Sequence, residues 1–306
     1  MTPTSLQDSV TYLASDAALA SVAREPYWPK WDSPWWHMVL LHEIGQSHLI
    51  PAPMARAMAG ALQTHYHPSF PLVESDLPEG IDPYRQLLCH CALGGILQAL
   101  AGAGLPIDEA FPGARAWFLR YQLPDGGLNC DEAVYTRPTP RSSMVSSISP
   151  LEAVLYHTDR PFTDDEVAFL DAGARYYLER RLVRSISKGA VIDEAWLTPC
   201  FPRFYEYDVL RGLRFVATWA HRLNRPLPQD AVAETIRHLE AHFADPAFPT
   251  RPWAQAQRTI PASGDGPTAP ASSFALLDEV SRPDVARTFL AAEWRRVQAT
   301  LLQLTR

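Results

Sequence analysis

The chain has 306 residues, 47% of them hydrophobic, including nine Trp, eleven Tyr and twelve Phe. This composition supplies ample core material for one large domain or two small ones. The formal net charge of −7 argues against nucleic acid or an anionic membrane surface as the main partner.

No stretch reaches the roughly 20 apolar residues of a membrane-spanning helix. The first residues lack the basic and apolar regions of a signal peptide. The four cysteines, at positions 89, 91, 130 and 200, indicate no disulfide framework. We therefore expect a soluble protein of the reducing cytoplasm, without a membrane span.

Helical periodicity dominates the chain, and clear runs of alternating β-branched residues are missing. Most of the 28 prolines fall between the periodic segments, which predicts many short helices with stiff joints. In chain order, we expect helices near 4–22, 34–45, 52–66, 82–103, 107–121, 143–157, 163–183, 205–223, 229–244, 271–280 and 283–304. Thr163 and Glu166 have capping-box spacing, so the acidic run 164–166 is predicted to begin a helix, not to form a catalytic acid cluster.

Weak self-similarity recurs about every 50–60 residues, and each unit corresponds to a helix pair. Such units cannot bury their apolar faces one at a time, so they must stack in a solenoid or close into a ring. No Gly/Ser-rich linker divides the chain, which predicts a single domain over 1–306. The loop 261–270 is predicted to lie on the surface, with a lid over a cavity mouth as the alternative.

The segment 121–132 is the most informative motif of the chain. An aromatic helix runs into Gln122-Leu123-Pro124-Asp125-Gly126-Gly127, where the proline cannot continue the helix and the glycines permit a sharp reversal. Serines 142, 143, 146 and 147 follow, and their hydroxyl groups suit a helix entry. An ordinary helix–turn–helix connection is the simpler interpretation of this segment on its own.

Gln-x-x-Asp-Gly-Gly followed by a small-residue helix entry resembles the repeat of squalene cyclases and protein prenyltransferase β subunits. The stretch Tyr207-Asp208-Val209-Leu210-Arg211 is similar to a helix opening in bacterial proteins described as squalene-cyclase-like or prenyltransferase-like. The resemblance covers about residues 30–250. It implies an all-α fold, an (α/α) toroid of helix pairs around an apolar cavity.

The function that this resemblance implies is cyclisation or prenyl transfer on an apolar, isoprenoid-related small molecule in the central cavity. The chain has the length of one toroid, without the second barrel of a squalene cyclase or the α subunit of a prenyltransferase. Two alternatives therefore stay open. One is a non-catalytic toroid that binds a ligand or a peptide, and the other is a zinc-dependent enzyme on the same fold.

Polar and aromatic residues beside the two motifs are the candidates for chemistry. The candidate catalytic residues are Asp131, Asp208 and Tyr207. The candidate substrate-binding residues are Trp117, Tyr121, Asn129, Ser147, Tyr205 and Arg211. Asn129-Cys130-Asp131-Glu132 only partly matches the Asp-x-Asp-Asp acid motif of class II terpene cyclases, since Asn129 replaces the first carboxylate. Asp208 has an alternative role, because an acid at a helix N-terminus favours the macrodipole.

Cys89-His90-Cys91 is the candidate metal-binding triplet. Neighbours on a helix are about 100° apart, so the three side chains cannot all face one way. One or two of them could join Cys130, Asp131, Cys200 or a distant His around zinc, and we take Cys91, Cys130 and His90 as the candidate ligands. Prenyltransferases and lanthionine cyclases hold zinc with Cys and His, but their ligand patterns are not matched here. Cysteine buried on an apolar helix face is the alternative, so zinc is a possible cofactor and no other is predicted.

Overall fold

The computed structural model describes residues 2–70, 76, 79–253 and 272–304, and this part is all-α, with isolated β-bridges but no strand. The predicted fold class is confirmed. The loop 261–270 lies outside the described residues. The α-helices are α1 (Pro3–Leu13), α2 (Asp16–Arg24), α3 (Pro34–Glu43), α4 (Ala52–Thr64), α5 (Pro83–Gln86), α6 (His90–Gly102), α7 (Ile107–Ala110), α8 (Ala114–Arg120), α9 (Met144–Tyr156), α10 (Asp164–Glu179), α11 (Val209–Arg222), α12 (Gln229–Ala244), α13 (Ala275–Val280) and α14 (Pro283–Leu304).

Three of the predicted helices are interrupted. The segment 4–22 divides into α1 and α2, because Ser15 caps α2 by accepting a 3.2 Å hydrogen bond from the Ala18 amide. The segment 82–103 divides into α5 and α6, and the segment 107–121 divides into α7 and α8. The capping box at Thr163 and Glu166 is present as predicted.

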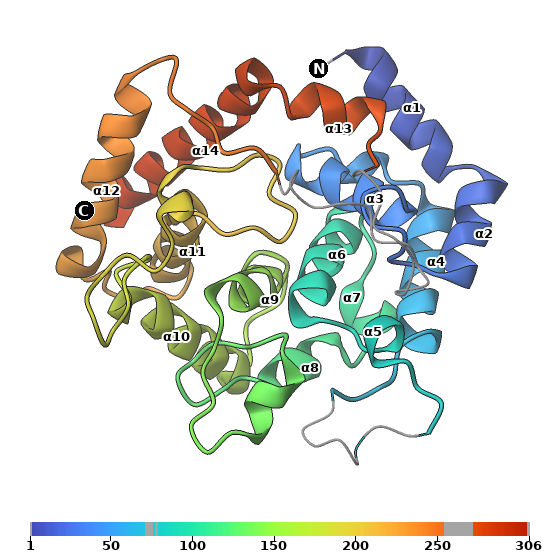
Figure 1. Ribbon diagram of the computed structural model, residues 1–306, viewed down its shortest axis with the longest axis horizontal. Coiled ribbons are helices and arrows are strands. Elements are labelled where there is room, and N and C mark those ends of the chain that lie inside the picture. The colour runs from blue at the N-terminus through green and yellow to red at the C-terminus, as the bar shows by residue number, and fades with distance from the viewer. Residues whose placement is uncertain (1, 71–75, 77–78, 254–271, 305–306) are drawn as a thin grey trace.

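The helices follow one another around the centre of the molecule (Figure 1). Helix α3 packs on α6, α6 on α9, α9 on α11 and α11 on α14. Helix α14 contacts α13, α13 contacts α1, and α1 contacts α3, so the contacts form a closed circuit. Helices α2, α4, α8, α10 and α12 lie toward the periphery. Such a circuit is necessary for a ring of helix pairs. The toroid of the family that the chain resembles stays a prediction.

Helices α3 and α9 are buried on nearly every side. All residues of α3 from Pro34 to Leu41 are buried, and so are most residues of α9. A helix that is hydrophobic all round is a core helix. The buried side chains form one hydrophobic cluster that extends from Leu13 to Val297.

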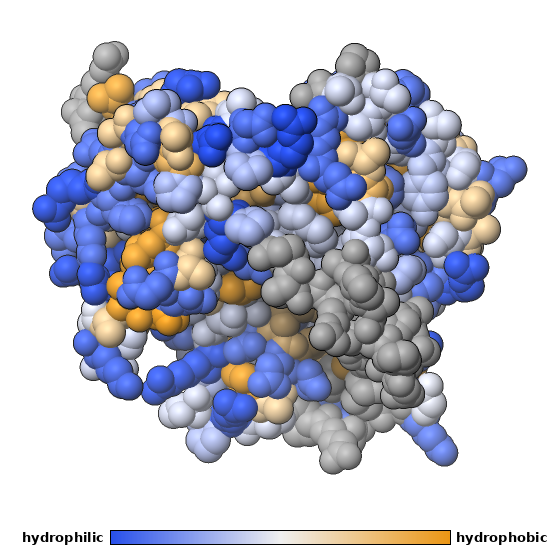
Figure 2. All heavy atoms as spheres, turned by 45° about the horizontal axis from the view of Figure 1, so that its top comes forward, coloured by the Kyte–Doolittle hydropathy of each residue, from blue (hydrophilic) through white to orange (hydrophobic). Residues whose placement is uncertain are grey.

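Hydrophilic residues predominate on the face in Figure 2, and apolar residues gather there only in smaller areas between them. No helix in the described part of the chain combines the length and the apolar character needed to span a bilayer.

Helices α6 and α9 approach each other closely at Gly94. A Cβ atom added at Gly94 would lie 2.5 Å from the backbone nitrogen of Pro150 and 2.5 Å from the carbonyl carbon of Ser149. Backbone atoms cannot move aside as a flexible side chain can. The absence of a side chain at residue 94 therefore permits this approach.

We predict that Gly94→Ala lowers the free energy of unfolding by about 2 kcal/mol, because it overpacks the α6–α9 contact. Gly95→Ala is the matched control, since a Cβ atom there meets nothing within 4 Å. It should raise the free energy of unfolding by up to about 1 kcal/mol through helix propensity. Urea denaturation followed by circular dichroism measures both, and equal effects would refute the packing argument.

Candidate functional site

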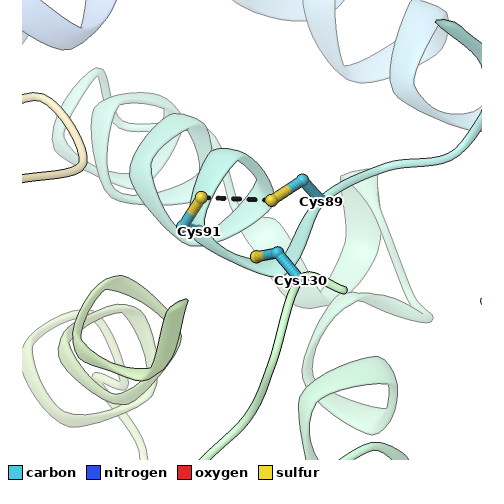
Figure 3. Close-up of side chains that lie close together, drawn as sticks. All are labelled: Cys89, Cys91 and Cys130. Atoms are coloured by element: carbon cyan, nitrogen blue, oxygen red, sulfur yellow. Dashed lines mark hydrogen bonds between the residues drawn. The ribbon is translucent and has the colours of Figure 1, made fainter. Parts of the chain in front are cut away.

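Three cysteines form a cluster at the N-terminal end of α6 (Figure 3). Cys89 and Cys91 belong to the helix start, and Cys130 belongs to the loop that follows the Asp-Gly-Gly turn. Their sulfur atoms all lie within 4.8 Å of one another. The Sγ atoms of Cys89 and Cys91 are 3.1 Å apart. We call this group the thiol cluster.

Cys89 and Cys91 converge because α6 begins between them. Cys89 is the N-cap residue, with an extended backbone (φ −62°, ψ 136°), and His90 is the first residue of the helix. An extended residue does not follow the 100° step of helical neighbours. The two thiols therefore reach the same side, and the helix predicted over 82–103 was wrong at this point.

His90 does not belong to the thiol cluster, which corrects the predicted ligand set of Cys91, Cys130 and His90. Its buried ring accepts a 2.9 Å hydrogen bond at Nδ1 from the indole N–H of Trp117. The proton must then be on Nε2, which lies 3.1 Å from the Tyr135 hydroxyl and donates to it. Burial lowers the pKa of His90 to about 4, so the ring stays neutral at pH 7. Cys89 takes its place beside Cys91 and Cys130.

The loop that carries Cys130 is held by the first turn of α9 and by Tyr135. The Cys130 amide donates to the Ser146 hydroxyl at 3.2 Å, and the Leu128 amide donates to the Ser147 hydroxyl at 2.8 Å. Tyr135 accepts from the Asn129 amide at 3.2 Å. The helix-entry serines and His90, acting through Tyr135, therefore position Cys130.

The Asp-Gly-Gly turn fixes the start of this loop. The Asp125 carboxylate accepts from the Ser142 amide at 3.1 Å and from the Ser142 hydroxyl. Gly126 has a φ of +96°, and a Cβ atom there would lie 2.2 Å from the carbonyl oxygen of Ala172. The motif thus has a structural role, because it delivers Cys130 to the thiol cluster.

The pKa values of the three thiols are shifted in different directions. Burial opposes ionisation of Cys130, but hydrogen bonds from Cys89 and Cys91 outweigh burial and lower the pKa of Cys130 well below its usual value. The hydrogen bonds to Cys130, together with burial, raise the pKa of Cys91 well above the usual value. The pKa of Cys89 is also raised, chiefly by its hydrogen bond to Cys130. Cys130 is thus the thiol of the cluster that ionises most readily.

The donor set and its spacing fit a zinc ion. Tetrahedral zinc with bonds of about 2.3 Å to sulfur separates its ligand atoms by about 3.8 Å. The observed spread of up to 4.8 Å, with 3.1 Å between Cys89 and Cys91, requires only small side-chain rotations to reach that value. Three thiolates leave one position of a tetrahedral ion open, as in catalytic zinc sites.

The thiol cluster lies in the wall of a cavity of about 450 Å³, which we call the thiol pocket. Its other walls are mainly aromatic and aliphatic, with Tyr27, Trp28, Leu88 and Tyr205 among them. Lys30 also lines it, and its Nζ atom lies 5.1–5.8 Å from four aromatic ring centres. Burial lowers the pKa of Lys30, while the nearby Cys91 and Cys89 oppose that shift. Within the described residues, no carboxylate pairs with Lys30.

The predicted catalytic residues do not line the thiol pocket. Asp131 is an exposed cap of a 3₁₀ turn, η3 (Glu132–Thr136). Asp208 is fully buried as the N-cap of α11 and pairs with Arg203 at 2.7 Å. Burial opposes its ionisation, but Arg203 outweighs this and lowers the pKa of Asp208, so it is no proton donor at neutral pH. Tyr207 is buried and donates to the Leu182 carbonyl at 2.7 Å.

Of the six predicted substrate-binding residues, Tyr205 alone lines the thiol pocket. Trp117 binds His90, and Tyr121 binds the backbone of Phe70, so both support the fold beside the pocket. Asn129 and Ser147 hold the loop of Cys130. Arg211 is buried against Glu152 at 2.6 Å and lines a different cavity.

The sequence interpretation missed Cys89 and Lys30. A helix start at His90 would have pointed to Cys89, but the apolar periodicity of 82–103 concealed this start. The sequence around Lys30 does not indicate that the chain turns there and places Lys30 beside the start of α6. No protein-family model, curated protein or solved structure matches this chain.

We predict that the purified protein binds one zinc ion per chain, measured by elemental analysis after dialysis against a weak chelator. Cys89→Ser, Cys91→Ser and Cys130→Ser should each weaken binding at least about tenfold. Cys200→Ala is the control, because Cys200 is buried elsewhere, beside Asp208. Zinc retained by Cys89→Ser but lost by His90→Asn would contradict the revised ligand set.

We also predict that Asp208→Asn lowers the free energy of unfolding by about 3 kcal/mol, because it leaves Arg203 short of a buried partner. Because the pKa of Asp208 is lowered in the folded state, its ionised carboxylate stabilises the fold above about pH 4, which is the pKa of an aspartate in the unfolded chain. This stabilisation is lost as the pH falls further. The variant should therefore lose less stability than the wild type between about pH 5 and 3. Asp131→Asn, at an exposed cap, should change stability by less than about 0.5 kcal/mol. Urea titrations at several pH values measure both variants.

Proposed function

We propose that this protein is an enzyme that acts on an apolar, isoprenoid-related small molecule in the thiol pocket, with zinc held by Cys89, Cys91 and Cys130. The observation that supports the proposal is the convergence of three sulfur atoms in the wall of an aromatic cavity. Structural zinc sites have four protein ligands, whereas a three-ligand site beside a cavity can admit a substrate atom.

The pocket suits an apolar substrate with an anionic end. Its volume of about 450 Å³ lies within the usual range for small-molecule sites. The rings of Tyr27, Trp28 and Tyr205 would exclude water and face the apolar body. Lys30, which lacks a carboxylate partner among the described residues, would attract the anionic group.

Zinc bound to the cluster would supply Lewis-acid activation of a substrate thiol or water at neutral pH. The chain's own residues would bind and orient the substrate. Lys30 would fix its anionic end, and the aromatic faces would stabilise positive charge that develops on carbon. Ser146, which holds the Cys130 amide, would keep that sulfur atom in place.

Cyclisation initiated by a protein acid has less support. Such chemistry needs a carboxylic acid whose pKa is raised and which faces the substrate. Asp208 is held ionised by Arg203, and Asp131 lies on the surface. We therefore favour metal-assisted chemistry over acid-initiated cyclisation.

The test incubates the zinc-loaded protein with farnesyl diphosphate, geranylgeranyl diphosphate or squalene, with and without N-acetylcysteine, and analyses the products by mass spectrometry. We expect turnover that Cys130→Ser abolishes and Cys200→Ala retains. Lys30→Gln should raise KM for a diphosphate substrate at least about tenfold, because one charge-assisted contact is lost. Lys188→Gln, at an exposed loop position, should leave KM unchanged.

Two outcomes would overturn the proposal. Saturable binding of these compounds without any product would favour the non-catalytic ligand-binding alternative. Failure of all three compounds to bind, at concentrations up to their solubility, would remove the isoprenoid-related substrate class.

A further inference from the structure

A second cavity, of about 520 Å³, lies on the other side of the segment 201–206. Residues of α3, α6, α9, α11 and α14 line it, so we call it the central cavity. Phe204 lines the central cavity, whereas its neighbour Tyr205 lines the thiol pocket. The segment thus separates two chambers with different chemistry.

Most charges around the central cavity are paired within the protein. Arg203 contacts Asp208 and Glu293, each at 2.7 Å. Arg211 binds Glu152 at 2.6 Å. These groups therefore form internal ion pairs and offer little charge to a ligand.

Glu43 is also engaged. Its carboxylate accepts hydrogen bonds from the backbone amides of Arg203, at 2.5 Å, and Phe204. Glu43 lines the central cavity, but its carboxyl oxygens are occupied by these two amides.

Arg214 is paired less closely, with Glu293 alone. Its nearest carboxylate oxygen, Oε1 of Glu293, is 3.5 Å away, and no hydrogen bond to the guanidinium group occurs within the described part of the chain. The group lies 4.7 Å from the ring centre of Tyr156, and its side chain is 40% exposed. Arg296, on the α14 side of the cavity, forms no ion pair with a described residue.

Two buried oxygen atoms beside Arg214 have no hydrogen-bond partner among the described residues. They are Oε1 of Glu293 and the hydroxyl of Tyr156. A buried polar atom without a hydrogen bond is costly, so its presence in a native structure calls for a water molecule or a ligand. The cavity wall thus offers donors from Arg214 and an acceptor from Glu293, and the ring of Tyr156 packs against the Arg214 guanidinium group.

We propose that the central cavity binds a small molecule that carries an oxyanion, a carboxylate or a phosphate, and that Arg214 is its principal ligand. The planar guanidinium group can donate two parallel hydrogen bonds to such an anion. Arg296 adds a second positive charge. Oε1 of Glu293 is placed to accept from a donor on the same molecule, and the stacked rings of Phe201 and Phe289, 4.6 Å apart, form an apolar wall. This site is separate from the thiol pocket and does not depend on zinc.

The test is isothermal titration calorimetry at constant ionic strength, with inorganic phosphate and with succinate as probes. We expect saturable binding of at least one of them, and the comparison identifies the preferred oxyanion. Arg214→Gln should weaken that binding at least about tenfold, because the positively charged guanidinium group is lost. Arg214→Lys should retain part of the affinity, because it keeps the charge.

Arg225→Gln is the matched control, since Arg225 has the same 40% exposure but pairs with Asp171 on another surface. It should leave the affinity unchanged, and none of these variants should change the zinc content. If neither probe binds saturably up to about 10 mM, the proposal is overturned. Ordered water molecules would then be the hydrogen-bond partners of Arg214, Glu293 and Tyr156. Binding that Arg214→Gln leaves intact would overturn the proposal as well.

Discussion

The contact between the Glu43 carboxylate and two successive backbone amides determines how the middle of this molecule is divided. Residue 43 ends α3, and the amides belong to Arg203 and Phe204, about half the chain away. Burial raises the pKa of the Glu43 carboxyl, and the two amide hydrogen bonds partly offset this effect. The segment 201–206 is thereby held against the end of α3. Phe204 of this segment lines the central cavity and Tyr205 lines the thiol pocket, so the contact holds residues of both cavities in place.

The two chambers differ because their charges are arranged differently. In the thiol pocket, sulfur atoms and a lysine amine lie among mainly aromatic and aliphatic side chains. Around the central cavity, arginines and glutamates neutralise one another over short distances. Buried ion pairs of this kind contribute little net stability, but leaving one member alone is costly. The ion pairs of Arg203 with Asp208 and Glu293, and of Arg211 with Glu152, therefore hold the cavity lining in place, whereas Arg214 has only the longer 3.5 Å pair with Glu293.

The sequence predicted the helices well because apolar periodicity and proline punctuation are local signals. The capping box at Thr163 and the turn at Gly126 were also predictable, since each depends on residues close in the chain. The role of Cys130 was only partly predictable, because its partner Cys89 is brought in by a helix start that periodicity concealed. Contacts such as Glu43 with Arg203 join segments 160 residues apart, and no local pattern encodes them.

The two successive glycines of α6 differ in the space that a side chain would find at each position. Residue 94 touches the backbone of α9, so any side chain there would force two helices apart. Residue 95, one position further along, borders the central cavity and has open space where a side chain would begin. Larger residues at 95 would narrow that chamber stepwise while the helix frame stays intact. The volume of the central cavity is thus adjustable by substitution at a single residue, although that residue lies only one helical turn from Cys91 of the thiol cluster.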